Sequence, residues 1–291
     1  MATTATTGNL ENAQNIIITA ARFTEEHNAP AMALIEQMNL PKGAKQVTVP
    51  KVGQMTISDL TDGFDIVDEE EIGMTTVDLT ASEVGAKVIL TDKLIRQSAN
   101  NIFSIVGRQL GDAMARKKDT DVHALYSGLN GGTTFGAAGA TMSLANIAGA
   151  IANAKGQKFG SQIYILQHPF ATFDIANTAV TATGAAAGIP DGFATDLLNN
   201  FFSNIRPLNG VPIFEDGNLS INSSTNDAVG VIADKSALGV LKSVDTRTER
   251  QRDASMRATE IIITADYGVF EIDDSKGAPL TFDASAPASG A

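Results

Sequence analysis

The segment that most constrains the fold, residues 46–90, is patterned as strands but has little with which to bury itself. Apolar residues alternate with polar ones in two runs, at Val47 and Val49 and again at Val77 and Leu79. A side-chain period of two is typical of β-strands. The two runs therefore predict the arms of a long hairpin. A two-stranded hairpin is marginally stable alone, so we expect this one to need a partner surface.

The stretch between the two runs is polar. It contains Thr61-Asp62-Gly63, which is typical of a turn, and then four consecutive acidic residues, Asp68, Glu69, Glu70 and Glu71. These residues predict a solvated, acidic outer part of the hairpin. The acidic run lacks the alternate spacing and the glycine of a calcium-binding EF-hand loop, so a solvated face is the better interpretation.

Two helices are predicted after the hairpin. Thr91-Asp92 supplies a capping side chain and an acidic residue at the start of the first. The second is expected over about residues 101–127, and at 1.5 Å per residue it would be about 40 Å long, the length of a strut. Its apolar stripe comprises Ile102, Ile105, Val106, Leu110, Ala113, Met114, Val122 and Leu125.

Helices and strands are mixed in the rest of the chain. Residues 10–38 predict a two-piece helical arm that Pro30 interrupts. Glycines at 128–141 predict a turn region, and a short amphipathic helix follows from Leu144. Strands are expected at 164–169, 208–216, 229–241 and 258–273, the third turning into a helix, with a flexible loop at 181–195. The fold class is therefore α+β with a protruding hairpin.

Composition excludes several classes of protein. The chain has no cysteine, so it can form neither a disulfide framework nor a thiolate metal site. Its N-terminus carries no positive charge, and no segment approaches the ~20 apolar residues of a membrane span. We therefore expect a soluble protein with no membrane partner. A net charge of −12 argues against a protein that binds nucleic acid tightly through its phosphates.

No motif for catalysis, a cofactor or a metal is present. His27, His123 and His168 lie far apart without metal-ligand spacing, so solvated or core positions are expected for them. The glycines at 131–136 lack the lysine of a phosphate loop. Ser236 lacks the flanking glycines of a nucleophile elbow. We predict a non-enzymatic protein with no catalytic, cofactor-binding or metal residues.

Four later segments complete a recognisable order. After the hairpin and the long helix come YILQHPFATFDI (164–175), LNGVPIFEDGNL (208–219), VIADKSALGVLK (231–242) and RATEIIITADYGVFEID (257–273). Over about residues 40–282, this order and spacing resemble the tailed-phage major capsid proteins of the Hong Kong 97-like fold. The resemblance implies an N-terminal arm (1–45), an extended loop (46–90), a peripheral domain (91–141 and 231–291) with a spine helix (101–127), and an axial domain (142–230).

The function that the resemblance implies is self-assembly into an icosahedral head shell. Hexamers and pentamers would form in the host cytoplasm and become the virion capsid, enclosing DNA without sequence-specific binding. Portal and scaffolding proteins are implied partners, and a decoration protein is a further candidate. Some relatives are crosslinked through a lysine of the extended loop. Lys51 and Lys87 lie in that region, but no complete crosslinking set aligns.

Two other classes of assembly stay open at this point. An encapsulin-like compartment shares the fold and would enclose cargo protein, and a filament-forming surface protein would share the missing cysteine and the few aromatic residues. Neighbouring genes would separate the first from a phage protein. The second needs long amphipathic helices at both ends, whereas the last fold-forming segment here is a strand.

Charge is distributed unevenly along the chain. Acidic residues are concentrated in the hairpin at Asp68–Glu71, whereas basic residues are concentrated in two later clusters. One cluster, on the spine helix, is Arg116, Lys117 and Lys118, and the other comprises Arg247, Arg250, Arg252 and Arg257. We predict that the acidic run of one subunit meets one of these clusters on a neighbour. Solvated faces are the alternative, because an exposed ion pair contributes only ~0.2–1 kcal/mol.

Overall fold

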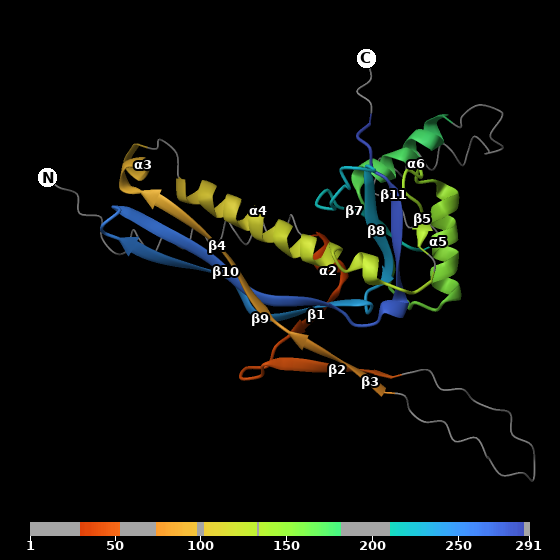
Figure 1. The fold of residues 1–291 in the computed structure, drawn as a ribbon, viewed down its shortest axis with the longest axis horizontal. Helices are drawn as coiled ribbons and strands as arrows, with labels where there is room; N and C mark the ends of the chain where they lie inside the picture. Colours follow the sequence, from red (N-terminus) through yellow and green to blue (C-terminus); the bar gives the residue numbers. More distant parts are fainter. Residues whose placement is uncertain (1–29, 53–73, 98–101, 133, 182–209, 288–291) are drawn as a thin grey trace, which may run out of the picture.

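The computed structural model describes residues 30–52, 74–97, 102–132, 134–181 and 210–287 (Figure 1). A four-stranded sheet and a five-stranded sheet are joined by a long helix, and a two-stranded hairpin leaves the first sheet. The mixed α+β architecture that the sequence predicts is confirmed. In the described part of the chain, no helix is long and apolar enough to span a membrane.

The four-stranded sheet has the order β1-β9-β10-β4. Its centre is the antiparallel pair β9 (Leu238–Asp253) and β10 (Ala258–Glu271). Strand β4 (Ser82–Thr91) lies antiparallel to β10 at one edge, and the short β1 (Glu36–Asn39) lies parallel to β9 at the other. The predicted strand at 258–273 is thus confirmed as the middle of this sheet.

Helix α4 (Ile102–His123) lies along one face of this sheet. Alternate residues of β10, including Ile261 and Ile263, are buried in one cluster with Val106, Leu110 and Met114 of the helix. Each fully buried aliphatic side chain contributes about 1.5–3 kcal/mol. The predicted apolar stripe is confirmed at these positions, but Ile105 is 46% exposed and Ala113 is exposed as well. The α-helix ends at His123, and a 3-10 turn follows at Tyr126–Gly128.

The five-stranded sheet has the order β5-β11-β8-β6-β7. These strands are β5 (Phe135–Gly136), β11 (Gly277–Asp283), β8 (Asp227–Asp234), β6 (Ile163–Gln167) and β7 (Ile213–Glu215). Helices α5 (Leu144–Gly156) and α6 (Pro169–Thr181) share a buried cluster with Ile165, Ile232 and Phe282. Residues of the opposite face, such as Leu166 and Val231, belong to the cluster that contains Tyr126. The C-terminal end of α4 therefore lies where the two sheets meet.

The five-stranded sheet contains strands from both the predicted axial domain (142–230) and the predicted peripheral domain (91–141 and 231–291). Strands β5 and β11 come from segments assigned to the peripheral domain, yet they pair beside strands of the axial segment. The boundary at 230/231 falls within β8. In the structure the chain crosses between the sheets three times within the described residues: after α4, between β8 and β9, and between β10 and β11.

The hairpin consists of β2 (Gln46–Val52) and β3 (Met74–Thr80). They pair antiparallel, with Val47 opposite Leu79 and Val49 opposite Val77, so the alternating apolar residues share one face as the period of two predicts. Leu79 is fully buried, whereas Val47 and Val49 are half-buried. Residues 82–91 form β4 of the four-stranded sheet. The predicted turn and acidic run, in 53–73, lie outside the described residues.

The helix predicted after Thr91 and the predicted N-terminal helical arm have different outcomes. The helix predicted at Thr91-Asp92 is confirmed as α3 (Asp92–Gln97), and the Thr91 hydroxyl accepts a hydrogen bond from the amide of Leu94 at 3.4 Å. The second piece of the predicted helical arm, in the described residues from Pro30 onward, ends earlier than expected. Helix α2 spans Pro30–Leu34, but the following residues form β1 because their backbone pairs with β9. Residues 10–29 of the predicted arm lie outside the described residues.

The expectation that residues 229–241 turn into a helix is wrong. Strand β8 ends at Asp234, whose carboxylate accepts hydrogen bonds from both the amide and the hydroxyl of Ser236, and this local turn leads directly into β9. Leu238 to Leu241 then pair with β10, and Gly239 to Leu241 also pair with β1. Sheet pairing therefore overrides the local preference of the segment. The loop predicted at 181–195 lies outside the described residues, apart from Thr181 at the end of α6.

Candidate functional site

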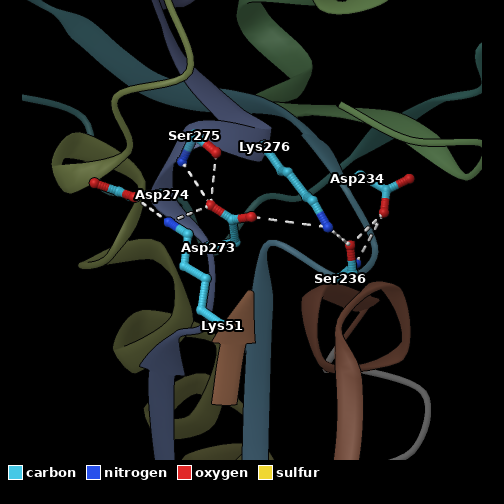
Figure 2. A network of polar contacts seen from close by, with 7 residues as sticks. All are labelled: Lys51, Asp234, Ser236, Asp273, Asp274, Ser275 and Lys276. Atoms are coloured by element: carbon cyan, nitrogen blue, oxygen red, sulfur yellow. Dashed lines mark hydrogen bonds and ion pairs between the residues drawn. The ribbon is translucent and has the colours of Figure 1, made fainter. Parts of the chain in front are cut away.

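The hairpin is anchored to the body of the subunit by Lys51 of β2. Its ammonium lies 2.6 Å from Oδ1 of Asp273 and 3.3 Å from Oδ1 of Asp274, in the connection between β10 and β11 (Figure 2). Hydrogen bonding to Asp273 raises the pKa of Lys51. Burial acts to raise the pKa of Asp273, but hydrogen bonds from Lys51 and Ser275 lower it overall. The contact is therefore a charged pair on the subunit's own surface.

The basic cluster on α4 is divided between the surface and the interior. The guanidinium of Arg116 lies 2.5 Å from Asp112, and the ammonium of Lys117 lies 2.6 Å from Asp121. Both pairs are one helical turn apart and exposed, so each adds little stability. Lys118 is only 9% exposed; its ammonium donates to the Thr246 hydroxyl at 3.2 Å. The expectation of a surface contact through Lys118 therefore needs correction, because this side chain packs against its own sheet.

The four arginines of the late cluster do not form one patch. Arg247 donates to the hydroxyl of Thr264, and Arg252 forms two 2.7 Å hydrogen bonds with the carboxylate of Asp92 at the start of α3. Arg250 is half-buried, and Arg257 lies in the β9–β10 turn with a positive φ of 49°. Strand alternation places Arg250 and Arg252 on one face of the sheet and Arg247 on the other.

A buried polar cluster that the sequence did not reveal joins α4 to the five-stranded sheet. Nε2 of His123 lies 3.0 Å from Oδ2 of Asp216, just after β7, and Asn218 donates to Oδ2 of Asp119 at 2.9 Å. Burial, aided by the charge of Asp216, raises the pKa of Asp119 to about 7. The sequence predicts a solvated or core position for His123, and the structure places its side chain in the core. No local motif identifies the pairing, since its members come from two distant segments.

The remaining candidate motifs form no reactive site within the described residues. His168 is buried, and its Nδ1 accepts a hydrogen bond from the amide of Phe170. Ser236 donates to Asp234 and accepts from Lys276, so its hydroxyl takes part in contacts of the β8–β9 turn and not in a pair with a histidine of the described residues. No group of three or more metal-binding side chains comes together in the described ranges. His27 and the acidic run Asp68–Glu71 lie outside them.

Solved structures of phage capsids share this fold. The chain resembles the capsid structure of the cyanophage P-SCSP1u, with 15% identity, a TM-score of 0.63 and coverage of 87% of each chain. It also resembles the capsid of Ralstonia phage GP4, with 12% identity, a TM-score of 0.64 and coverage of 88% of this chain and 89% of that one. Mycobacterium phage Che8 gives 17% identity, a TM-score of 0.61 and coverage of 84% and 86%. The fold is thus the Hong Kong 97-like capsid fold.

A profile of a phage capsid protein family matches residues 74–278, and the chain belongs to this family. It is a major capsid protein, a structural subunit of the phage head rather than an enzyme, and its location is the virion. Membership in this family decides against the encapsulin-like compartment and the surface filament. No curated protein matches the sequence significantly.

Proposed function

We propose that this capsid protein assembles as hexamers and pentamers into a closed icosahedral shell that encloses the phage genome without sequence-specific contacts. The observation that supports this most directly is the hairpin. Its apolar face, with Val47, Val49 and Val77, is only half-buried in the isolated subunit. A second copy that covers this face would remove apolar surface from water, which stabilises an assembly by about 25 cal/mol per Å².

The domain roles in this proposal follow the two sheets. The five-stranded sheet with α5 and α6 is the axial domain around the centre of each hexamer or pentamer, and the four-stranded sheet with α4 is the peripheral domain. The axial core lies in residues 142–230, joined by the strands β5 and β11. Portal and scaffolding proteins are the proposed assembly partners, with a decoration protein as a further one, and assembly takes place in the host cytoplasm.

We also propose that charge pairing between subunits contributes to assembly geometry. The acidic partner is Asp68, Glu69, Glu70 and Glu71 of one subunit. The basic partner is on a neighbour, either the exposed pair Arg116 and Lys117 or the arginines Arg247, Arg250, Arg252 and Arg257. Each pair alone contributes little, but every subunit of a shell repeats the contact.

Electron microscopy of the purified protein, with sedimentation at rising concentration, tests the shell function. We expect rings of five or six subunits and closed shells. A protein that sediments as a single monomer at every salt concentration and shows no shells would contradict the proposal. Filaments without closed shells in the same images would contradict it as well.

A further inference from the structure

Among the described residues, the hairpin contacts the subunit body both at its base and further along β2. The first contact is at the base, where Leu79 is buried and the end of β3 passes so close to β10 that a side chain at Gly268 would overlap the Thr80 carbonyl oxygen. The second is the ion pair of Lys51 with Asp273 and Asp274. In the β2–β3 ladder Lys51 is opposite Thr75. This position is five residues from Gln46, which lies opposite Thr80 at the base of the hairpin. At ~3.3 Å per residue, the contacts are about 17 Å apart along the strand.

Asp273, the partner of Lys51, lies where the three connections between the two sheets are hydrogen-bonded to one another. The amides of Ile272 and Asp273 both donate to the carbonyl of Ala237, in the β8–β9 turn. The amide of Asn130, in the crossing that follows α4, donates to the carbonyl of Asp274. Asp273 therefore belongs to a junction at which the connections between the two sheets are hydrogen-bonded to one another.

Side chains extend this junction on the other side of Asp273. Its Oδ1 accepts hydrogen bonds from the amide and hydroxyl of Ser275 at 3.2 and 2.6 Å. Figure 2 shows Lys276 reaching away from Lys51 toward Ser236, whose hydroxyl is held by Asp234. A continuous polar chain thus runs from the hairpin strand, across the β10–β11 connection, to the β8–β9 turn.

We propose that Lys51 is a positioning residue for assembly: by binding Asp273 it directs the hairpin and couples that direction to the angle between the two sheets. This inference rests on the proposed shell function, because the hairpin is the surface offered to a neighbour. The partner is a second copy of the chain. A hairpin released from the junction pivots about its base and meets the neighbouring copy at variable angles, so assemblies lose a uniform curvature.

Distances measured in the unassembled subunit test the coupling directly. The chain has no cysteine, so spin labels attach only at introduced ones. Exposed sites are Thr76 on β3, Ala113 on α4 and Gln157 after α5. For Lys51→Met we expect a broader, shifted Thr76–Ala113 distribution and a broader Ala113–Gln157 distribution, which reports the angle between sheets. Lys51→Arg should restore both, and Lys45→Met, at an exposed lysine just before β2, should change neither.

Two further variants show whether Lys51 acts through Asp273. Asp273→Asn keeps an oxygen for the Ser275 bonds but removes the charge, so it should reproduce Lys51→Met, and the double variant should show no added effect. About 1 M NaCl, which screens a half-exposed pair, should broaden the wild-type distributions but not those of Lys51→Met. Thermal unfolding establishes that each variant is folded.

The same variants are then imaged after assembly. We expect shells of one size from wild type and from Lys51→Arg, and shells of mixed size or open sheets from Lys51→Met. Identical distance distributions in wild type and Lys51→Met would overturn the proposal, as would shells of one size from Lys51→Met. If wild type forms no shell at all, the shell function fails, while the distances measured in the subunit still decide whether Lys51 directs the hairpin.

Discussion

The imidazole of His123 lies 3.0 Å from the carboxylate of Asp216, and this contact joins the end of the spine helix to the five-stranded sheet. Both side chains are almost fully buried. Asp119, one turn earlier on the helix, binds Asn218, two residues after Asp216. The interface between the helix and the sheet is thus polar at its centre. The ionisation of Asp119 in this interface affects the stability of the subunit.

Asp119 makes the stability of the unassembled subunit depend on pH. Its pKa is raised to about 7 from an ordinary value of 3.8, mainly by burial. Between these values the folded state holds a proton that the unfolded state has lost, so the Asp119 contribution is fully present below pH 3.8 and is lost as the pH rises through about 7. We expect Asp119→Asn to flatten this part of the plot of unfolding free energy against pH. At alkaline pH the unfolding free energy of the variant should exceed that of wild type by a few kcal/mol.

Chemical denaturation at intervals across this window measures the effect, with Asp245→Asn, at an exposed carboxyl of β9, as the control. The difference between wild type and Asp119→Asn should grow with pH. A constant difference would mean that folding does not raise the pKa of Asp119, contrary to the expectation.

The apolar face of the spine helix is the subject of a second prediction. Leu110 is 3% exposed and packs in the cluster that joins α4 to the four-stranded sheet, whereas Ala113 on the same helix is exposed. Leu110→Asp buries an unpaired charge, so we expect a loss of several kcal/mol and an unfolded subunit. Ala113→Asp should change the free energy of unfolding by less than about 1 kcal/mol. Circular dichroism melts compare the two, and equal melting temperatures would contradict the assignment.

Two glycines should respond in opposite directions to alanine. Gly136 has φ of 80°, and a side chain there would overlap the carbonyl oxygen of Thr281 in β11. Gly136→Ala should therefore cost about 3 kcal/mol. Gly149 lies on the exposed side of α5 with open space around it, so Gly149→Ala should stabilise by about 1 kcal/mol through helix propensity. Urea denaturation checks both, and stabilisation by Gly136→Ala would show that the backbone of β5 shifts to accommodate the methyl group.

Charge reversal in the hairpin tests the proposed contact between subunits. Changing Glu69, Glu70 and Glu71 to lysine should leave the melting temperature of the subunit unchanged but reduce the yield of shells. Reversal of Arg116 and Lys117, or of Arg247, should restore the yield if that group is the partner. Light scattering at several salt concentrations measures assembly. Normal yield and normal salt sensitivity of the triple variant would identify the acidic run as a solvated tip only.

Local patterns were enough to predict most secondary structure. The alternation around Val47 and Val77, the stripe of Leu110 and Met114, and the cap at Thr91 each depend on residues close in sequence, so propensity and periodicity indicate them. The error at 235–241 arose because the backbone of Gly239 and Val240 pairs with β1 and β10, and pairing with distant strands determines the conformation there. The prediction that the hairpin needs a partner surface came from its polarity pattern alone.

The sequence by itself determined most elements of this protein, their order and most of the face that α4 buries, because these depend on neighbouring residues. Only the tertiary structure decided which charged groups meet. Lys51 and Asp274 are 223 positions apart, and His123 and Asp216 are 93 apart. Such pairs form only when the register of two sheets and the three crossings between them place distant segments together. The same packing turned Lys118 inward and separated Arg247 from Arg252, although sequence spacing had suggested clusters.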